Sequence, residues 1–252
     1  MTSSADPYKG LSSVYDQHSH EEVSIAFLKA IRPMLRKMAP KGVVLELGCA
    51  SGLLTTRIAA AGRPVIGVDR SRTMLRLARR RCAAQGARVR LVAADFTALP
   101  RLPKCGLAVA CCDVVNHIPS RTLVARTFRE AYRNLEDGGS LVFDALQRSC
   151  FERYWVDQTY YMEADTGDVI MECDWNPRRG MGTVRMTVFK KSASGGYAKR
   201  VVNLHEYLYE PRFVERALRS AGFSKVRGTQ WSPWSDQARE GPMDRILWVA
   251  TR

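Results

Sequence analysis

Acidic residues stand at the ends of short apolar runs through the first half of this sequence. Glu46 lies just before a loop that carries Gly48 and Gly52, while Asp69, Asp95 and Asp113 follow the next three apolar runs. A glycine loop lets the backbone approach a ligand closely, because a Cβ atom would block it. A carboxylate at position 46 can meet an ammonium group, whereas it would repel a pyrophosphate.

Alternating apolar and amphipathic segments must place these residues. Strands are predicted at 43–47, 64–69, 89–93, 107–113 and 140–145, and helices at 23–38, 53–61, 71–85 and 119–136. Ser71 is a suitable N-cap for one helix, and the turn at 137–139 ends another. This order predicts an α/β fold with a doubly wound parallel sheet. Ligands bind such sheets at the carboxyl ends of the strands, where the acids fall.

The pattern changes in the second half of the chain. Segments 168–175, 182–190 and 197–207 alternate with a period close to two, which predicts antiparallel strands. A helix over 211–221 and a hairpin of 223–231 with 244–251 are expected to complete the main sheet. The sequence thus predicts one domain over residues 1–252, with a β insertion over 150–208.

Composition and charge favour an ordinary globular protein. Of the 252 residues, 46% are hydrophobic and 25% charged, and the net charge is +14. Excess arginine can indicate an RNA partner, but the densest patch, at 72–81, has the spacing of a solvated helix face. We therefore expect no nucleic-acid partner.

The cysteines and the apolar runs exclude other classes. The seven cysteines form no CxxC pair and show no metal-ligand spacing, so no metal site is expected. No apolar run has the length of a membrane span, and the first residues lack the apolar core of a secretory signal. The expected compartment is the cytoplasm, with no membrane partner.

The glycine loop departs from a dinucleotide-binding fingerprint. Ala50 separates Gly48 and Gly52, so GxGxxG is not matched. Together with Asp69, Asp95-Phe96, Cys111-Cys112-Asp113 and the 135–141 turn, the loop resembles the class I methyltransferases that use S-adenosylmethionine (SAM). The resemblance covers residues 40–146 and the closing elements after 210.

That resemblance implies a seven-stranded Rossmann-like sheet, SAM as cofactor and S-adenosylhomocysteine (SAH) as product. Asp69 would accept hydrogen bonds from both ribose hydroxyls and Asp95 from the adenine amino group, while the Phe96 amide would donate to the ring. The full set of expected cofactor contacts is Glu46, Gly48, Cys49, Ala50, Gly52, Asp69, Arg70, Met74, Asp95, Phe96, Cys112 and Asp113.

Two residues are candidates for catalysis. His117 follows the fourth strand and has the pKa range of a general base, although it could instead pack against the next helix. Tyr15, in Val14-Tyr15-Asp16, resembles the opening of the N,N-dimethyltransferases that act on amino-deoxysugars. In that resemblance, residues 1–38 form a helical lid over the cofactor and the tyrosine lines the active site.

The β insertion also resembles the substrate cover of those enzymes. Candidate substrate contacts are Asn116, Tyr161, Trp175, Arg185 and His205. Aromatic residues here could equally form the insertion's own core, and Asn116 could cap a turn. Arg185 and Val184 must lie on opposite faces of their strand.

The predicted function is therefore methyl transfer from SAM to a nitrogen or oxygen of a small molecule. An RNA or protein methyltransferase is the alternative that the +14 charge supports, and a SAM-binding module without catalysis is a third. A monomer and a homodimer are equally compatible with the sequence.

Overall fold

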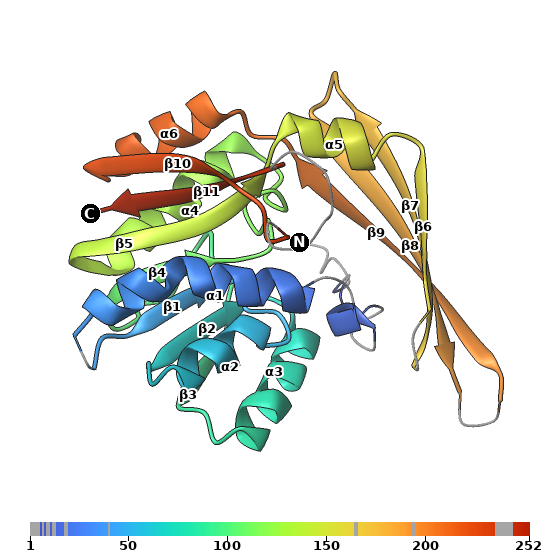
Figure 1. Ribbon diagram of the computed structural model, residues 1–252, viewed down its shortest axis with the longest axis horizontal. Helices are drawn as coiled ribbons and strands as arrows, with labels where there is room; N and C mark the ends of the chain where they lie inside the picture. The colour runs from blue at the N-terminus through green and yellow to red at the C-terminus, as the bar shows by residue number, and fades with distance from the viewer. Residues whose placement is uncertain are drawn as a thin grey trace.

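A seven-stranded sheet forms the centre of the molecule in the computed structural model, which describes residues 6, 8, 11, 14–17, 20–39, 41–163, 166–192, 195–234 and 244–252 (Figure 1). The strands are β1 (Val44–Leu47), β2 (Val65–Asp69), β3 (Val89–Ala93), β4 (Cys105–Ala110), β5 (Leu135–Leu146), β10 (Lys225–Trp231) and β11 (Arg245–Thr251). Their order is β10-β11-β5-β4-β1-β2-β3. β1 to β5 are parallel, and β11 is antiparallel to both its neighbours.

Helices cover both faces of this sheet, as the doubly wound prediction requires. α1 (His20–Lys37) and α2 (Leu53–Ala60) share one buried cluster with β1, β2 and β4, and α4 (Arg121–Asn134) and α6 (Pro211–Ser220) pack on the other face. α3 (Arg72–Ala84) lies beside β3 and begins at the Ser71 N-cap, whose hydroxyl accepts from the Met74 amide. The predicted fold class is confirmed.

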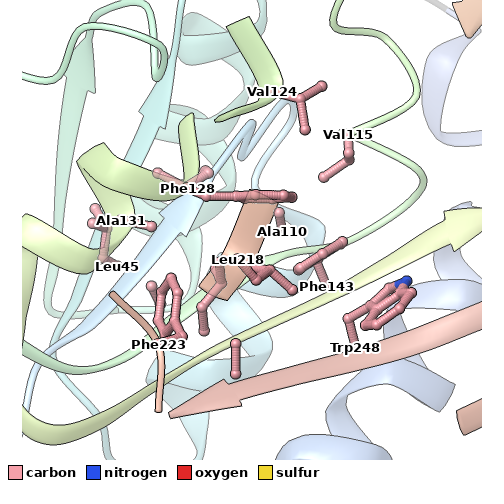
Figure 2. Packing of buried hydrophobic residues seen from close by; sticks show 14 of the residues in the cluster. Leu45, Ala110, Val115, Val124, Phe128, Ala131, Phe143, Leu218, Phe223 and Trp248 are labelled. Carbon is pink, nitrogen blue, oxygen red and sulfur yellow. The ribbon is translucent and has the colours of Figure 1, made fainter. Parts of the chain in front are cut away.

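Aromatic packing closes the core between α4 and the sheet. Phe128 of α4, Phe143 of β5 and Trp248 of β11 lie in a row, with centroid separations of 5.2 Å and 6.3 Å (Figure 2). All three side chains are buried. Burial of a side chain of this size contributes about 1.5–3 kcal/mol, so this row anchors the antiparallel hairpin to the parallel part of the sheet.

The insertion forms a second sheet at one side of the main sheet (Figure 1). α5 (Arg148–Tyr154) leads into β6 (Gln158–Met162), β7 (Gly167–Asn176), β8 (Met181–Lys191) and β9 (Tyr197–Tyr207), which pair antiparallel in that order. The sequence predicted the last three strands but not β6. One face of the sheet is apolar and packs on Leu11 and Val14, which precede α1.

β4 ends earlier than the sequence pattern predicts. The predicted strand continues to residue 113, yet β4 stops at Ala110 because Cys112 and Asp113 adopt left-handed φ angles of 64° and 50°. Such angles are unusual for residues with a side chain and require support from the surroundings. They turn the chain sharply at the carboxyl edge of the sheet.

The N-terminal segment divides into two parts. α1 buries Val23, Phe27, Ile31 and Leu35 at a spacing of four residues, so it is a layer of the core. The predicted lid over residues 1–38 is therefore too long. Only the described residues before α1, which include the short helix η2 (Tyr15–Gln17), lie outside that layer.

Asn116 connects the two sheets. Its Nδ2 donates to the carbonyl oxygen of Tyr207 at 3.0 Å, and its Oδ1 accepts from the Leu146 amide at 3.0 Å. Its own carbonyl accepts from the Tyr207 amide at 2.7 Å. Because the side chain is fully buried, Asn116 holds the end of β9 against the end of β5, and it is not the substrate contact that the sequence suggested.

Asn116→Ala should lower the free energy of unfolding by about 2–6 kcal/mol, because the buried Leu146 amide and the partly buried Tyr207 carbonyl lose their partners at about 1–3 kcal/mol each. Asn203→Ala, at an exposed position of β9, should change it by less than about 0.5 kcal/mol. Urea unfolding of both variants checks this expectation. Equal midpoints would contradict the role given to Asn116.

Candidate functional site

A pocket opens at the carboxyl edge of the main sheet. Ten of its lining residues were predicted from sequence, namely Tyr15, Gly48, Ala50, Asp69, Arg70, Met74, Asp95, Phe96, Cys112 and His117. Sequence reasoning missed Tyr8, Thr97, Cys111, Val114, Ile118, Pro119 and Leu123. Most of the missed residues are adjacent in the sequence to a predicted one, so extending each predicted group at a strand end by one residue would have included them. Tyr8 had no such signal.

The glycine loop forms the floor of this pocket. Gly48 has a φ of 69°, and a Cβ there would lie 2.9 Å from a methyl carbon of Val114, so no larger residue fits. Ala50 also adopts a positive φ, of 44°. Its amide donates to Oδ2 of Asp69 at 2.9 Å, which holds the loop against the end of β2.

Asp69 is the polar centre of the pocket. Its Oδ2 accepts from Ala50, and its Oδ1 accepts from the Ser71 amide at 2.7 Å. Burial raises the pKa of Asp69, whereas these two hydrogen bonds and the neighbouring Arg70 act to lower it. Each carboxylate oxygen has a second lone pair. The side chain can therefore hold the loop and still accept from two ligand hydroxyls.

Three predicted cofactor residues in or just before the loop do not line the pocket. Cys49 is buried against Gly67, and Gly52 packs on Ala78 of α3. Glu46 is buried and accepts a hydrogen bond of 2.5 Å from Thr55. Burial raises the pKa of Glu46 to about 8. These residues shape the loop, and a contact of Glu46 with a bound ammonium group stays a prediction.

An ion pair connects the segment before α1 to α3, and hydrogen bonds of Ser51 connect it to the glycine loop. Arg81 of α3 contacts Asp16 at 2.7 Å and donates to the Ser51 carbonyl at 3.0 Å, and the Ser51 hydroxyl also donates to Asp16. The Asp16 of the Tyr-Asp pair thereby holds Tyr15 over the pocket. The ring of Tyr15 meets that of Tyr8 edge to face at 5.9 Å.

A second pocket adjoins the first beneath the insertion. Tyr8, Tyr15, Cys112 and His117 line both pockets. The other walls are mainly apolar, formed by Leu11, Val14, Trp155, Met171, Val184, Met186 and Leu204. Asp113 and Glu206 are the acidic residues among the described walls, and Glu206 was not predicted.

Four predicted substrate contacts lie away from both pockets. Arg185 pairs with Glu172 at 2.5 Å on the outer face of the insertion, and the exposed His205 contacts Thr183. Tyr161 is 62% exposed, and Trp175 is buried in a stack on Phe151 with centroids 4.6 Å apart.

The predicted placement of Arg185 and Val184 on opposite faces was correct, but Tyr161, Arg185 and His205 lie on the polar face. The apolar face, with Val184 and Leu204, is the one that meets the pocket. A charged residue on that face, Glu206 two positions after Leu204, was the signal that could have indicated the site.

Comparisons with known proteins agree with this arrangement. Residues 44–139 match the family described as a methyltransferase domain. A protein of Geobacillus sp. (strain WCH70) that is named as a methyltransferase is 24% identical, over 97% of this chain and 99% of its own length.

Two solved structures share the whole fold. One is a SAM-dependent methyltransferase from Clostridium acetobutylicum, with a TM-score of 0.78, 18% identity, and coverage of 98% of this chain and 99% of the other. The second is an amino pentose methyltransferase from Micromonospora echinaspora, involved in calicheamicin biosynthesis. Its TM-score is 0.71 and its identity 18%, over 100% of this chain and 99% of the other.

This chain is a SAM-dependent methyltransferase. Its cofactor is SAM, and the first pocket has the features that SAM requires. The loop at Gly48 admits no Cβ, and Asp69 offers acceptors for a ribose diol. Among the described residues no helix is long and apolar enough to cross a membrane.

Asp69→Ala should weaken SAM binding by about 1–3 kcal/mol, because the ribose hydroxyls lose a charged acceptor. Glu163→Ala removes the same charge from an exposed site and serves as the matched control. Calorimetric titration with SAM measures both variants, and thermal unfolding checks that each is folded. Unchanged affinity in the folded Asp69 variant would refute the assignment.

Asp16→Ala should speed SAM dissociation roughly two- to fivefold, since a half-exposed ion pair contributes up to about 1 kcal/mol. Glu21→Ala breaks the comparable pair with Arg57, at 2.7 Å, without touching the pocket. Stopped-flow displacement of bound SAM distinguishes the two variants. A rate that moves equally in both would show that Asp16 does not hold the segment over the cofactor.

Proposed function

We propose that this methyltransferase transfers the methyl group of SAM to a nitrogen or oxygen of a small molecule held in the second pocket. The observation that carries the proposal is the junction of the two pockets at Tyr15, Cys112 and His117. A donor in the first pocket and an acceptor in the second would meet there. The amino pentose methyltransferase with the same fold supports a small acceptor.

The walls of the second pocket favour a small molecule over RNA or protein. Leu11, Trp155 and Met186 belong to three separate segments that surround the pocket, and such a pocket suits a compact ligand. The +14 charge is the support for the alternative. Incubation with labelled SAM, and either amino-sugars and phenols or tRNA and protein extract, tests the choice. Label transferred only to macromolecules would overturn the proposal.

His117 is the residue that we assign to proton removal. SAM supplies a methyl carbon activated by a positively charged sulfur, so the acceptor needs a base only if it must lose a proton. Burial lowers the pKa of His117 from its ordinary 6.5, and the charge of Asp113 opposes that shift. A neutral imidazole at pH 7 can accept a proton. Tyr15 cannot, because burial raises its pKa well above the ordinary 10.

His117→Ala should leave SAM affinity unchanged and lower turnover roughly a hundredfold, which is the usual contribution of a general base. Turnover is measured with the best acceptor from the labelled-SAM screen. His205→Ala is the matched control, because that ring lies on the outer face of the insertion. A turnover near that of the unaltered enzyme would reduce His117 to a packing role.

The pH profile gives a second check on His117. A base works in its unprotonated form, so turnover should rise with pH through the lowered pKa and level off near pH 7. The rising limb should therefore lie below pH 6.5. Asp113 acts to raise this pKa, and Arg70 and Arg245 act to lower it; Glu206 stands 3.9 Å from the ring. A limb above pH 6.5 would contradict the assignment.

A further inference from the structure

Glu206 is a buried carboxylate that faces the second pocket. Its exposed fraction is 8%, and its Oε2 has no hydrogen-bond partner among the described residues. Leaving such a group without a partner is costly, so a buried polar atom of this kind calls for an explanation. The atom lies in a wall where an acceptor molecule is expected to bind.

The surroundings of Glu206 carry an excess of negative charge. Arg245 contacts both Asp113 and Asp144, at 2.8 Å and 2.5 Å. Among the described residues, it is the permanently charged cation that forms ion pairs in this cluster. His117 lies 3.9 Å from Glu206 and is held towards its neutral form by burial. Three carboxyl groups therefore share one permanent cation.

This shortage of positive charge favours the protonated form of Glu206. Burial and the charge of Asp113 raise the pKa of Glu206 well above its ordinary value, and a hydrogen bond with Asp113 raises it further. Two carboxyl groups so close share a proton because they cannot both ionise cheaply. A positively charged ligand group in the pocket would favour the ionised pair instead.

The position of Glu206 is set by the backbone. The next residue, Tyr207, is held by Asn116 through both its amide and its carbonyl. Leu204, on the same face of β9, lines the pocket beside it. The carboxylate is therefore presented to the pocket at the rigid end of a strand, next to apolar walls that suit a hydrocarbon body.

We propose that Glu206 binds the protonated amino group of the acceptor, and that the acceptor is a primary or secondary amine carried on an apolar body. This inference rests on the proposed function, since it names the class of molecule that enters the second pocket. The amine ion-pairs with the ionised carboxylate and places its nitrogen beside His117.

The transfer then balances as follows. The ammonium group loses one proton to the Glu206 carboxylate or to the neutral ring of His117, which frees the nitrogen lone pair. That lone pair forms a bond to the methyl carbon as the carbon–sulfur bond breaks, and the bonding electrons stay on sulfur, which becomes neutral. The product leaves as a methylated ammonium ion, and the proton on the enzyme returns to solvent.

A divalent metal ion is the competing occupant. One ligand atom each from Asp113, His117 and Glu206 lies within 4.8 Å of the others. Carboxylate and imidazole groups can bind a metal. A bare ion, however, would leave the apolar walls formed by Val184, Met186 and Leu204 without a partner. The amine accounts for both the charge and the walls.

Calorimetry with matched amine and alcohol pairs tests the proposal. Butylamine, cyclohexylamine and benzylamine are compared with butanol, cyclohexanol and benzyl alcohol, with SAH bound and EDTA present. At least one amine should bind the unaltered enzyme roughly tenfold or more tightly than its alcohol. Glu206→Gln should remove that preference and leave SAH affinity unchanged. Glu172→Gln, on the outer face of the same sheet, should keep the preference.

The other outcomes overturn the inference. Glu206 is excluded as the amine site if no amine binds more tightly than its alcohol. It is also excluded if the preference for the amine survives in Glu206→Gln. A preference lost in EDTA and restored by Zn²⁺ would assign the cluster to a metal. If SAH itself does not bind, the assignment of the cofactor pocket and the proposed function are both wrong. If SAH binds and the enzyme methylates an alcohol, only this inference is overturned.

Discussion

The contact of Arg245 with Asp113 and Asp144 is the interaction on which the rest of the site depends. Asp113 ends the turn after β4, Asp144 belongs to β5, and Arg245 begins β11. The largely enclosed guanidinium supports the left-handed turn at Cys112 and Asp113. After this turn Cys112 lines both pockets, and the chain continues into the loop that carries His117. A charge held away from water is costly unless it is paired, so these ion pairs connect the last strand of the sheet to the turn after β4.

The main sheet and the insertion have separate tasks that this turn connects. At the ends of the parallel strands, Gly48, Ala50 and Asp69 shape the first pocket, where backbone geometry matters more than side-chain size. The insertion supplies apolar walls and one carboxylate, Glu206. Two solved structures at 18% identity keep this architecture, so the fold tolerates wide sequence change, and the acceptor must be argued from the residues of the site.

The N-terminal segment closes the arrangement from the third side. Asp16 is paired with Arg81 and bonded to Ser51, so Tyr15 is positioned by α3 and by the glycine loop at once. Burial keeps Tyr15 protonated, which suits it to contact ligands and not to accept protons. The proposed proton acceptors, His117 and Glu206, lie 3.9 Å apart, and the charge of Asp113 raises the pKa of each.

The sequence by itself determined the alternation of strands and helices and the loop from Gly48 to Gly52, because those signals are local: hydrophobic period, N-cap and glycine spacing. Only the tertiary structure decided which face of the insertion meets the pocket, since a period of two leaves both faces equally possible. The sequence therefore directed attention to Arg185 and His205, which face outward, and passed over Glu206. It also left Asn116 open between a ligand contact and a turn cap, because its partners, Leu146 and Tyr207, are 30 and 91 residues away. Contacts over such separations depend on packing that no local pattern records.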